Sequence, residues 1–356
     1  MKQILLVKLN HIGDTLLMTP TIRFLKQRFP HCAIDVIVRS GCEGVLQGNR
    51  DIRHLMVAAH PNPKNRTLKR TIQEQWKIVK TITLRRYDFG FDLSNSDRAK
   101  LYLLLSAAKI RGINNWKLMP LWKLKLFNRT SGYAWGPHHQ VLKDFRTVTD
   151  VMGLEGEAGP LVINTEVDRS DMEKRVADLP WHKPYVVIHP TSRWQFKQWL
   201  PESWAEVADR LNREKGLSVV FSIGPGEVES RALDQILAHC QLSHTTIRGA
   251  LQLRQLAYVM EHAALFLGVD TVAMHLAAAV QLPAVALFGP SSEWSWSPWL
   301  SSHQLVLGPC DCKKTRKFIC DKSRPYPCME AIRVETVMAQ AEKLLRDPAA
   351  HAQRQL

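Results

Sequence analysis

Short runs of apolar residues alternate along the chain with longer segments in which apolar residues recur every three or four positions. The runs 4–9, 33–38 and 89–93 are nearly unbroken and predict buried strands, whereas 15–29 and 73–84 have the spacing of helices. Unbroken apolar strands separated by helices are typical of a parallel sheet that is covered on both faces. The first part of the chain therefore predicts an α/β unit.

A second series of the same kind follows a turn at Pro180. Its predicted strands are 185–189, 217–223, 265–268 and 284–288, and its predicted helices are 202–214, 227–240, 253–263 and 272–280. Two such series predict an α/β protein with two Rossmann-like parallel-sheet domains that face each other across a cleft. We expect the domains to be residues 1–170 and 171–345, followed by a frayed polar tail at 346–356.

The segment 111–136 interrupts this alternation, because it interleaves aromatic residues with lysines. One interpretation is an irregular surface segment or an edge hairpin. The other is an amphipathic patch that meets a membrane surface or an acidic acceptor. The pattern alone leaves both open.

The 356 residues carry a formal net charge of +15, with a denser basic stretch at 64–125. Such a surface attracts polyanions, which include nucleic acid, phosphorylated glycans and an anionic membrane leaflet. No basic tail of the kind found in nucleic-acid arms is present. The chain contains no run of about 18 apolar residues, so the sequence predicts no membrane-spanning helix. The first apolar run is too short for a signal peptide, so we expect a cytoplasmic protein.

The segment 8–14 joins the first predicted strand to the first predicted helix. Gly13 permits a tight backbone there, and Asp14 stands where the helix begins. Asp14 fits the N-cap of that helix. It also fits a catalytic base at the end of a strand, where a carboxylate can take a proton from an acceptor hydroxyl. The helix N-terminus would keep it ionised.

The segment 189–199 follows another predicted strand and gathers Thr191, Ser192, Arg193 and Lys197 on one loop. Hydroxyls and cationic side chains together fit a diphosphate, since they supply hydrogen bonds and positive charge. The alternative is a solvated loop whose tryptophans pack on the core.

The segment 265–275 predicts a strand, a turn and a helix. The unpaired backbone N–H groups of a helix beginning at Thr271 and Val272 can hold an anion. Asp270 fits an N-cap or a residue that binds sugar hydroxyls beside the diphosphate. We interpret His275, one turn further on, as a structural residue.

The segment 224–229 also follows a strand and carries Glu227 and Glu229. An acidic side chain in this place can accept hydrogen bonds from ribose hydroxyls, or it can stabilise the first turn of a helix. The spacing of the glycines differs from that of a dinucleotide fingerprint.

Four of the seven cysteines, Cys310, Cys312, Cys320 and Cys328, fall within 19 residues of one another. Four thiols can bind zinc or form a labile disulfide, and the alternative is a loop with reduced thiols. We expect the isolated Cys32, Cys42 and Cys240 to be buried or inert.

Together these motifs resemble glycosyltransferase family 9, the lipopolysaccharide heptosyltransferases. The resemblance rests on the segments 12–14, 189–193, 268–275 and 287–290, and it extends from the first strand to about residue 340. The segment 191–197 looks most like the heptosyltransferase III type, which adds the branch heptose. The loop is one residue longer than in the type I enzymes, and the cysteine group is similar to one in type II enzymes.

The resemblance implies a GT-B fold, with an acceptor-binding first domain and a donor-binding second domain. It implies inverting transfer of L-glycero-D-manno-heptose from ADP-heptose to the lipopolysaccharide inner core, without a metal or other cofactor. No D-x-D metal clamp occurs in the chain. Asp14 matches the general base of the family. The donor-binding positions that match are Thr191, Ser192, Lys197, Glu229, Leu251, Asp270, Thr271 and Val272.

The enzyme would then work peripherally on the anionic inner face of the inner membrane, and it would bind no nucleic acid. Transfer of the type I or II kind to the same core is an alternative. Two further alternatives are a nucleotide-sugar epimerase on the same fold and a basic binding protein without activity.

Overall fold

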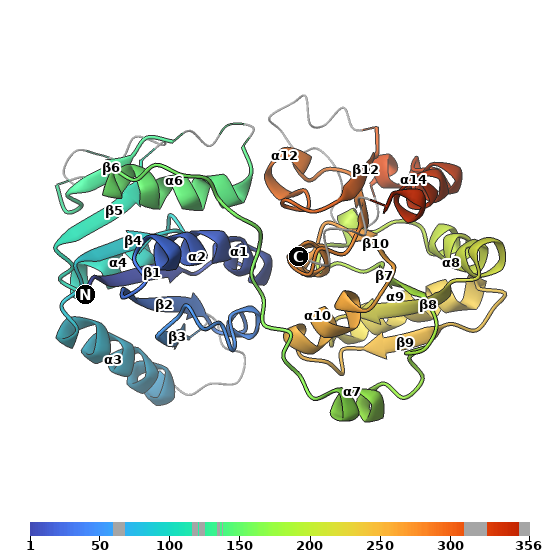
Figure 1. Cartoon of the computed structure of the whole chain (residues 1–356), viewed down its shortest axis with the longest axis horizontal. Helices are drawn as coiled ribbons and strands as arrows, with labels where there is room; N and C mark the ends of the chain where they lie inside the picture. Colours follow the sequence, from blue (N-terminus) through green and yellow to red (C-terminus); the bar gives the residue numbers. More distant parts are fainter. Residues whose placement is uncertain are drawn as a thin grey trace. The chain divides into compact units, whose positions relative to one another are not determined.

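The computed structural model describes residues 1–59, 68–115, 120, 125–133, 136, 138–309 and 326–348. The chain divides into two compact units, Met1–Asn164 and Thr165–Leu356, which are considered separately below (Figure 1). The division falls between residues 164 and 165, where the sequence led us to expect 170 and 171. No helix within the described ranges has the length and apolar character needed to cross a bilayer.

The first unit is built on a parallel sheet with the strand order β3-β2-β1-β4-β5-β6. Its strands are β1 (Gln3–Lys8), β2 (Ala33–Arg39), β3 (His54–Ala58), β4 (Phe89–Asp92), β5 (Ile110–Asn114) and β6 (Arg129–Ser131). Its helices are α1 (Ile12–Leu17), α2 (Thr19–Arg28), η1 (Glu43–Val45), α3 (Leu68–Leu84), α4 (Asp97–Leu105) and α6 (Gln140–Met152).

The prediction of one helix over 15–29 is wrong, because the segment forms two helices that meet at Met18. Pro20 has no N–H to donate to the carbonyl of Leu16, four residues earlier. The hydroxyl of Thr19 donates to that carbonyl instead, at 2.7 Å. The break therefore follows from a single proline, and it makes α1 a short helix directly after β1.

The core of the first unit lies between the sheet and its helices. Leu5, Val7 and Ile37 from the strands pack with residues of α3 and α4 such as Ile82 and Leu103. The carboxylate of Asp35 on β2 is buried in this unit, and it accepts hydrogen bonds from Arg53, Arg85 and Tyr87.

The second unit has a parallel sheet with the order β12-β11-β10-β7-β8-β9. Its strands are β7 (Tyr185–His189), β8 (Ser218–Ile223), β9 (Thr245–Arg248), β10 (Leu265–Val269), β11 (Ala284–Phe288) and β12 (His303–Leu307). Its helices are α7 (Arg169–Arg175), η2 (Gln195–Lys197), α8 (Pro201–Lys215), α9 (Glu227–His239), α10 (Leu253–Glu261), α11 (Val272–Ala279), α12 (Glu293–Trp296), α13 (Pro327–Glu330) and α14 (Val334–Arg346).

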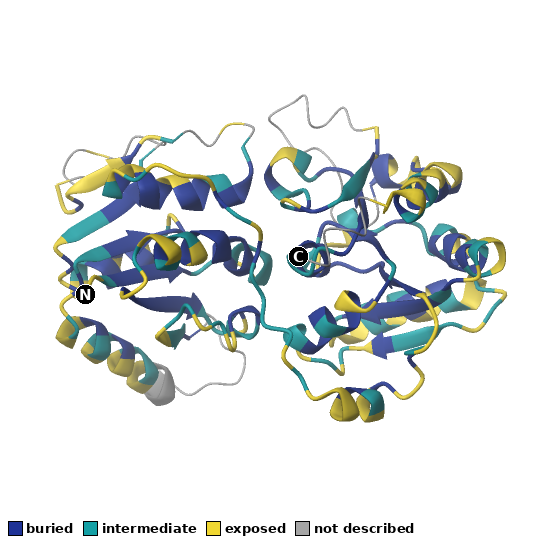
Figure 2. Cartoon of the chain, in the orientation of Figure 1, coloured by how far each residue is buried: buried dark blue, intermediate teal, exposed yellow. Residues whose placement is uncertain are grey.

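The central strands β7, β10 and β11 are buried along their whole length, as Figure 2 shows by their dark blue colour. Helices such as α8, α9 and α14 keep exposed outer faces, whereas α11 has no exposed residue. This is the arrangement expected for a parallel sheet with helices on both faces. The predicted fold class, α/β with two parallel sheets, is confirmed.

Each sheet has one point at which the strand order reverses. In the first unit the chain builds β1, β2 and β3 outwards and then returns to place β4 on the other side of β1. In the second unit it builds β7, β8 and β9 and then places β10 beside β7. Loops that leave neighbouring strands in opposite directions open a crevice at such a point, and ligands bind there.

Candidate functional site

In the first unit the loops after β1 and β4 are tied together at the reversal point. The carboxylate of Asp92, at the end of β4, accepts the N–H groups of Ser94 and Asn95 at 2.7 and 2.9 Å. The Ser94 hydroxyl then accepts the N–H of Leu9, at 2.6 Å. Asn95 has a φ of 51°, in the left-handed region that asparagine tolerates better than most residues. These bonds hold the two loops together at the reversal point.

Asp14 lies beside this reversal point, on the first turn of α1. Its Oδ2 accepts the backbone N–H of His11 at 3.1 Å. The N-cap is His11, and Asp14 is the third helical residue, so the interpretation of Asp14 as the N-cap is corrected. The carboxylate is half-buried and held by the helix that it helps to begin.

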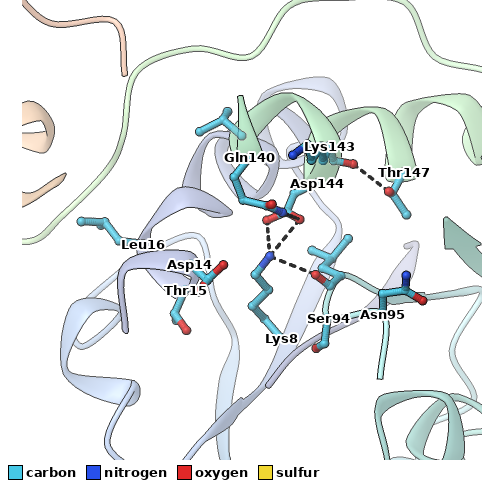
Figure 3. Close-up of polar contacts among 12 residues, drawn as sticks. Lys8, Asp14, Thr15, Leu16, Ser94, Asn95, Gln140, Lys143, Asp144 and Thr147 are labelled. Carbon is cyan, nitrogen blue, oxygen red and sulfur yellow. Dashed lines mark hydrogen bonds and ion pairs between the residues drawn. The ribbon is translucent and has the colours of Figure 1, made fainter. Parts of the chain in front are cut away.

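Two residues that the sequence did not single out lie beside Asp14 (Figure 3). Lys8 is the last residue of β1, and it is fully buried. It lies 2.9 and 2.6 Å from the two oxygens of Asp144 on α6, and it donates to the Leu93 carbonyl at 2.9 Å. Gln140 also donates to Asp144, at 2.9 Å. The only sequence signal was a lysine at the end of an otherwise apolar strand.

The charges in this cluster act on one another. The pKa of Asp144 is raised to about 6, mainly by burial and to a smaller extent by the negative charge of Asp14, against the lowering effect of Lys8. Burial also lowers the pKa of Lys143, the neighbour of Asp144 on α6. Asp14 therefore lies within electrostatic reach of a buried ion pair.

In the second unit the loops after β7 and β10 meet at the reversal point. Lys197, at the end of η2, lies with its Nζ 2.5 Å from Oδ2 of Asp270, which follows β10. The side chain of Asp270 is 8% exposed and that of Lys197 is 20% exposed. The structure thus brings together two of the predicted donor-binding residues, one cationic and one anionic.

Thr191 and Glu229 form a second contact across the same end of the sheet. The Thr191 hydroxyl donates to Oε2 of Glu229 at 2.8 Å, and the Gly224 N–H donates to the same oxygen at 2.7 Å. Glu227, the competing candidate, is exposed on α9 and pairs with Arg231. Of the two acidic residues, Glu229 is the one that lies against the loop after β7.

His189, the last residue of β7, was part of the sequence motif but received no role. Its Nδ1 lies 3.0 Å from the Ser222 hydroxyl on β8. Burial lowers the pKa of His189 to about 4, against the raising effect of the Glu229 charge. The imidazole is therefore neutral at physiological pH and serves as a hydrogen-bonding residue beneath the loop.

The helix after β10 begins at Val272, with Thr271 as its N-cap. The interpretation of Asp270 as the N-cap is therefore corrected. Its carboxylate forms an ion pair with Lys197 instead. The Oγ1 atom of Thr271 is buried and has no hydrogen-bond partner among the residues that the structure describes. A buried hydroxyl without a partner at the start of a helix is typical of a place where a ligand binds.

The other predicted donor-binding residues have more local surroundings. Ser192 is buried, and its hydroxyl accepts the N–H of Trp194 at 3.2 Å, within the loop after β7. Leu251 is half-buried in the turn before α10. Both therefore remain candidates on position.

The cysteine group is described only at Cys328, which is buried at the start of α13. Cys310, Cys312 and Cys320 lie outside the described residues, as do 116–119 and 121–124 of the aromatic and basic segment. Cys32, Cys42 and Cys240 are free thiols, the first two buried and the third half-buried.

Two α/β units, each built on a parallel sheet with one reversal of strand order, are typical of the GT-B fold of nucleotide-sugar glycosyltransferases. The chain belongs to glycosyltransferase family 9 (heptosyltransferase), whose model matches residues 75–324. It is 28% identical over 351 residues to lipopolysaccharide heptosyltransferase 3 of Escherichia coli K12, covering 97% of this chain and 99% of the relative.

Solved structures support the same fold. A family 9 glycosyl transferase from Veillonella parvula superposes with a TM-score of 0.81 at 20% identity, covering 97% of each chain. The E. coli ADP-heptose lipopolysaccharide heptosyltransferase II superposes with a TM-score of 0.75 at 21% identity, covering 97% of this chain and 98% of that chain.

Proposed function

We propose that this glycosyltransferase moves L-glycero-D-manno-heptose from ADP-heptose to a hydroxyl of the lipopolysaccharide inner core, with inversion at the anomeric carbon. The observation that carries the proposal is the pairing of Lys197 with Asp270 at the reversal point of the second sheet. One residue fits a phosphate and the other fits sugar hydroxyls, so together they suit a nucleotide sugar. The names of the relatives, which are lipopolysaccharide heptosyltransferases, supply the sugar and the acceptor.

In the donor site, Lys197 and the hydroxyls of Thr191 and Ser192 would hold the diphosphate. The N–H groups at the start of α11, with the Thr271 hydroxyl, would hold the same group from the other loop. Asp270 would accept hydrogen bonds from the heptose hydroxyls. Glu229 would accept hydrogen bonds from the ribose hydroxyls, and Leu251 would contact the adenine ring. Binding would break the pair between Lys197 and Asp270, because each partner then has the donor as its ligand.

In the first unit, Asp14 would act as the general base. The oxygen of an acceptor hydroxyl attacks the anomeric carbon of the donor, and its proton passes to the Asp14 carboxylate. The bond between the anomeric carbon and the β-phosphate oxygen breaks, and ADP leaves with the electron pair. Positive groups at the diphosphate stabilise the charge that develops on ADP.

The specific transfer that we propose is addition of the branch heptose. It is supported by 28% identity to a heptosyltransferase numbered 3 and by the segment 191–197. Transfer of the type I or II kind is the alternative, and defined acceptors distinguish the two.

We also propose that the enzyme works peripherally at the anionic inner membrane face. In the described residues, five of the twelve exposed large hydrophobic side chains come from α3 and α4: Ile72, Trp76, Leu84, Leu101 and Leu105. The two helices are joined by bonds such as that from the Thr83 hydroxyl to the Leu105 carbonyl, at 3.1 Å. Residues 68–86 hold six basic residues and one acidic residue. An apolar face with tryptophan and flanking cations suits an anionic bilayer.

The decisive experiment is a mass-spectrometric assay of transfer from ADP-heptose to defined truncated cores. We expect one heptose to be added to a core that lacks only the branch heptose. Addition only to a core that lacks the earlier heptoses would favour the type I or II alternative. Conversion of the donor without any acceptor would indicate an epimerase instead. A binding protein without activity would give no product and would not be stabilised by ADP.

A further inference from the structure

The buried pair of Lys8 and Asp144 has no place in the reaction just described, although it lies beside the proposed base. Both side chains are at most 3% exposed. Removing two charges from water is costly, and a buried ion pair is often no more stabilising than apolar residues of the same volume. The position of the pair next to Asp14 therefore suggests a role in the chemistry of that carboxylate.

The hydrogen bonds of Lys8 indicate that Asp144 takes up the donors of its ammonium group. An ammonium group has three N–H donors. Lys8 makes contacts with both oxygens of Asp144 and with the Leu93 carbonyl, at 2.6 to 2.9 Å. Its donors are therefore used on the loop after β4 and on α6, and among the described residues Lys8 has no hydrogen bond to Asp14. Asp14 is close enough to this pair to act electrostatically on Asp144, so without Asp144 its carboxylate would be a counter-charge for the buried ammonium.

An ion pair between Lys8 and Asp14 would oppose catalysis. It would stabilise the carboxylate form, so that Asp14 became a weaker base, and it would occupy the oxygen needed by the acceptor hydroxyl. We propose that Asp144 is a positioning residue that takes up the charge and the donors of Lys8 and thereby leaves the Asp14 carboxylate available to the acceptor. This inference rests on the proposed function, because it assumes that Asp14 is the base.

The proposal also requires electrostatic coupling between Asp14 and Asp144. The charge of Asp14 is one of the causes that raise the pKa of Asp144, and interactions between two titrating groups are mutual. The charged groups that face Asp144 are Lys8 on β1, Asp14 on α1 and Lys143 on α6. On the other side of Asp14, Arg39 of β2 contacts the His11 ring at 3.1 Å.

The test is the acid limb of the pH profile of kcat/KM in three variants. In Asp144→Asn, Lys8 keeps its charge and loses its counter-charge. We therefore expect the acid limb to move to lower pH by about one unit or more. At the plateau, kcat should fall by roughly tenfold because the base is weaker.

In Lys8→Met, the buried Asp144 has no counter-charge and takes up a proton, so that both charges disappear together. The acid limb should then stay at its wild-type position. The double variant Lys8→Met/Asp144→Asn should behave in the same way. A simple structural role would instead give the same change in all three variants, as a loss of stability without movement of the limb.

Asp35→Asn is the matched control, because it removes another buried carboxylate that is bonded to cations in the same sheet. It should lower stability and leave the acid limb in place. His11→Gln removes the imidazole at this turn. Made in the wild type and in Asp144→Asn, it shows whether the His11 imidazole contributes to the acid limb of kcat/KM.

An acid limb of Asp144→Asn that coincides with the wild-type limb would overturn the inference. If Asp144→Asn does not fold, the double variant decides, since a movement of its limb or a loss of more than about 100-fold in kcat would contradict the proposal. Failure of the proposed function is separate: it would appear as near wild-type turnover of Asp14→Asn, whatever Asp144→Asn does. Affinity for ADP should be unchanged in every variant, because Asp144 belongs to the first unit.

Discussion

Lys197 and Asp270 are 73 residues apart in the sequence, and their side chains form an ion pair of 2.5 Å at the reversal point of the second sheet. The pair satisfies both charges when no donor is present. We propose that Lys197 binds the diphosphate of the donor and that Asp270 binds its sugar. Variants of the two residues should therefore differ in how they change the binding of ADP and of ADP-heptose.

We expect Lys197→Met to weaken ADP binding by about tenfold or more, because a charge-assisted hydrogen bond to the diphosphate contributes roughly 1.5–3 kcal/mol. Asp270→Asn should bind ADP at least as tightly as the wild type, because Lys197 then has no ion pair to break. It should weaken the binding of ADP-heptose relative to that of ADP, since the Asp270 carboxylate is proposed to contact the sugar. Isothermal titration with both ligands measures this difference. Equal losses for ADP and ADP-heptose in Asp270→Asn would contradict the sugar assignment.

Asp14→Asn should lower turnover by about 10²–10⁴-fold, the range that a general base contributes. ADP affinity should remain at its wild-type value. Asp88→Asn, just before the amino end of β4 in the same sheet, is the control, because it also removes a carboxylate that accepts a backbone N–H. Near wild-type kcat in Asp14→Asn would show that another group takes the proton.

The pH dependence of stability should include a contribution from His189. Its pKa is about 4 in the folded protein and about 6.5 in the unfolded chain, so the unfolded state binds a proton in this window that the native state does not. The contribution of His189 to the free energy of unfolding is therefore fully present above pH 6.5. It falls by about 3 kcal/mol as the pH decreases towards 4.

Thermal unfolding between pH 7.5 and 4.5 measures this loss. We expect His189→Gln to flatten the dependence and His182→Gln, at an exposed position of the same unit, to leave it unchanged. A slope in His189→Gln equal to that of the wild type would place the responsible titration elsewhere.

Membrane association should depend on the outer face of α3 and α4. Trp76→Ser should reduce co-sedimentation with phosphatidylcholine vesicles that contain phosphatidylglycerol, because tryptophan contributes strongly at a bilayer interface. Trp294→Ser is a close control, since Trp294 is 65% exposed and Trp76 is 67% exposed. The wild type should bind vesicles without phosphatidylglycerol weakly. Equal losses in the two variants would argue against this surface.

The central strands could be predicted from the sequence, and several edge strands could not. β1, β7 and β10 are buried almost throughout, so they read as unbroken apolar runs. β3, β6 and β9 lie at or near sheet edges and include exposed positions, so their patterns resemble loops. The break at Met18 was missed, although Pro20 signals it.

For the candidate site, the sequence by itself determined where the chain turns from strand to helix and which polar residues stand at those turns. Asp14, Thr191, Lys197 and Asp270 were all predicted as site residues in this way, because such turns have local signatures. Only the tertiary structure decided which distant side chains meet. Asp144 reaches Lys8 across 136 residues, because α6 packs over the sheet and burial leaves each charge one suitable partner.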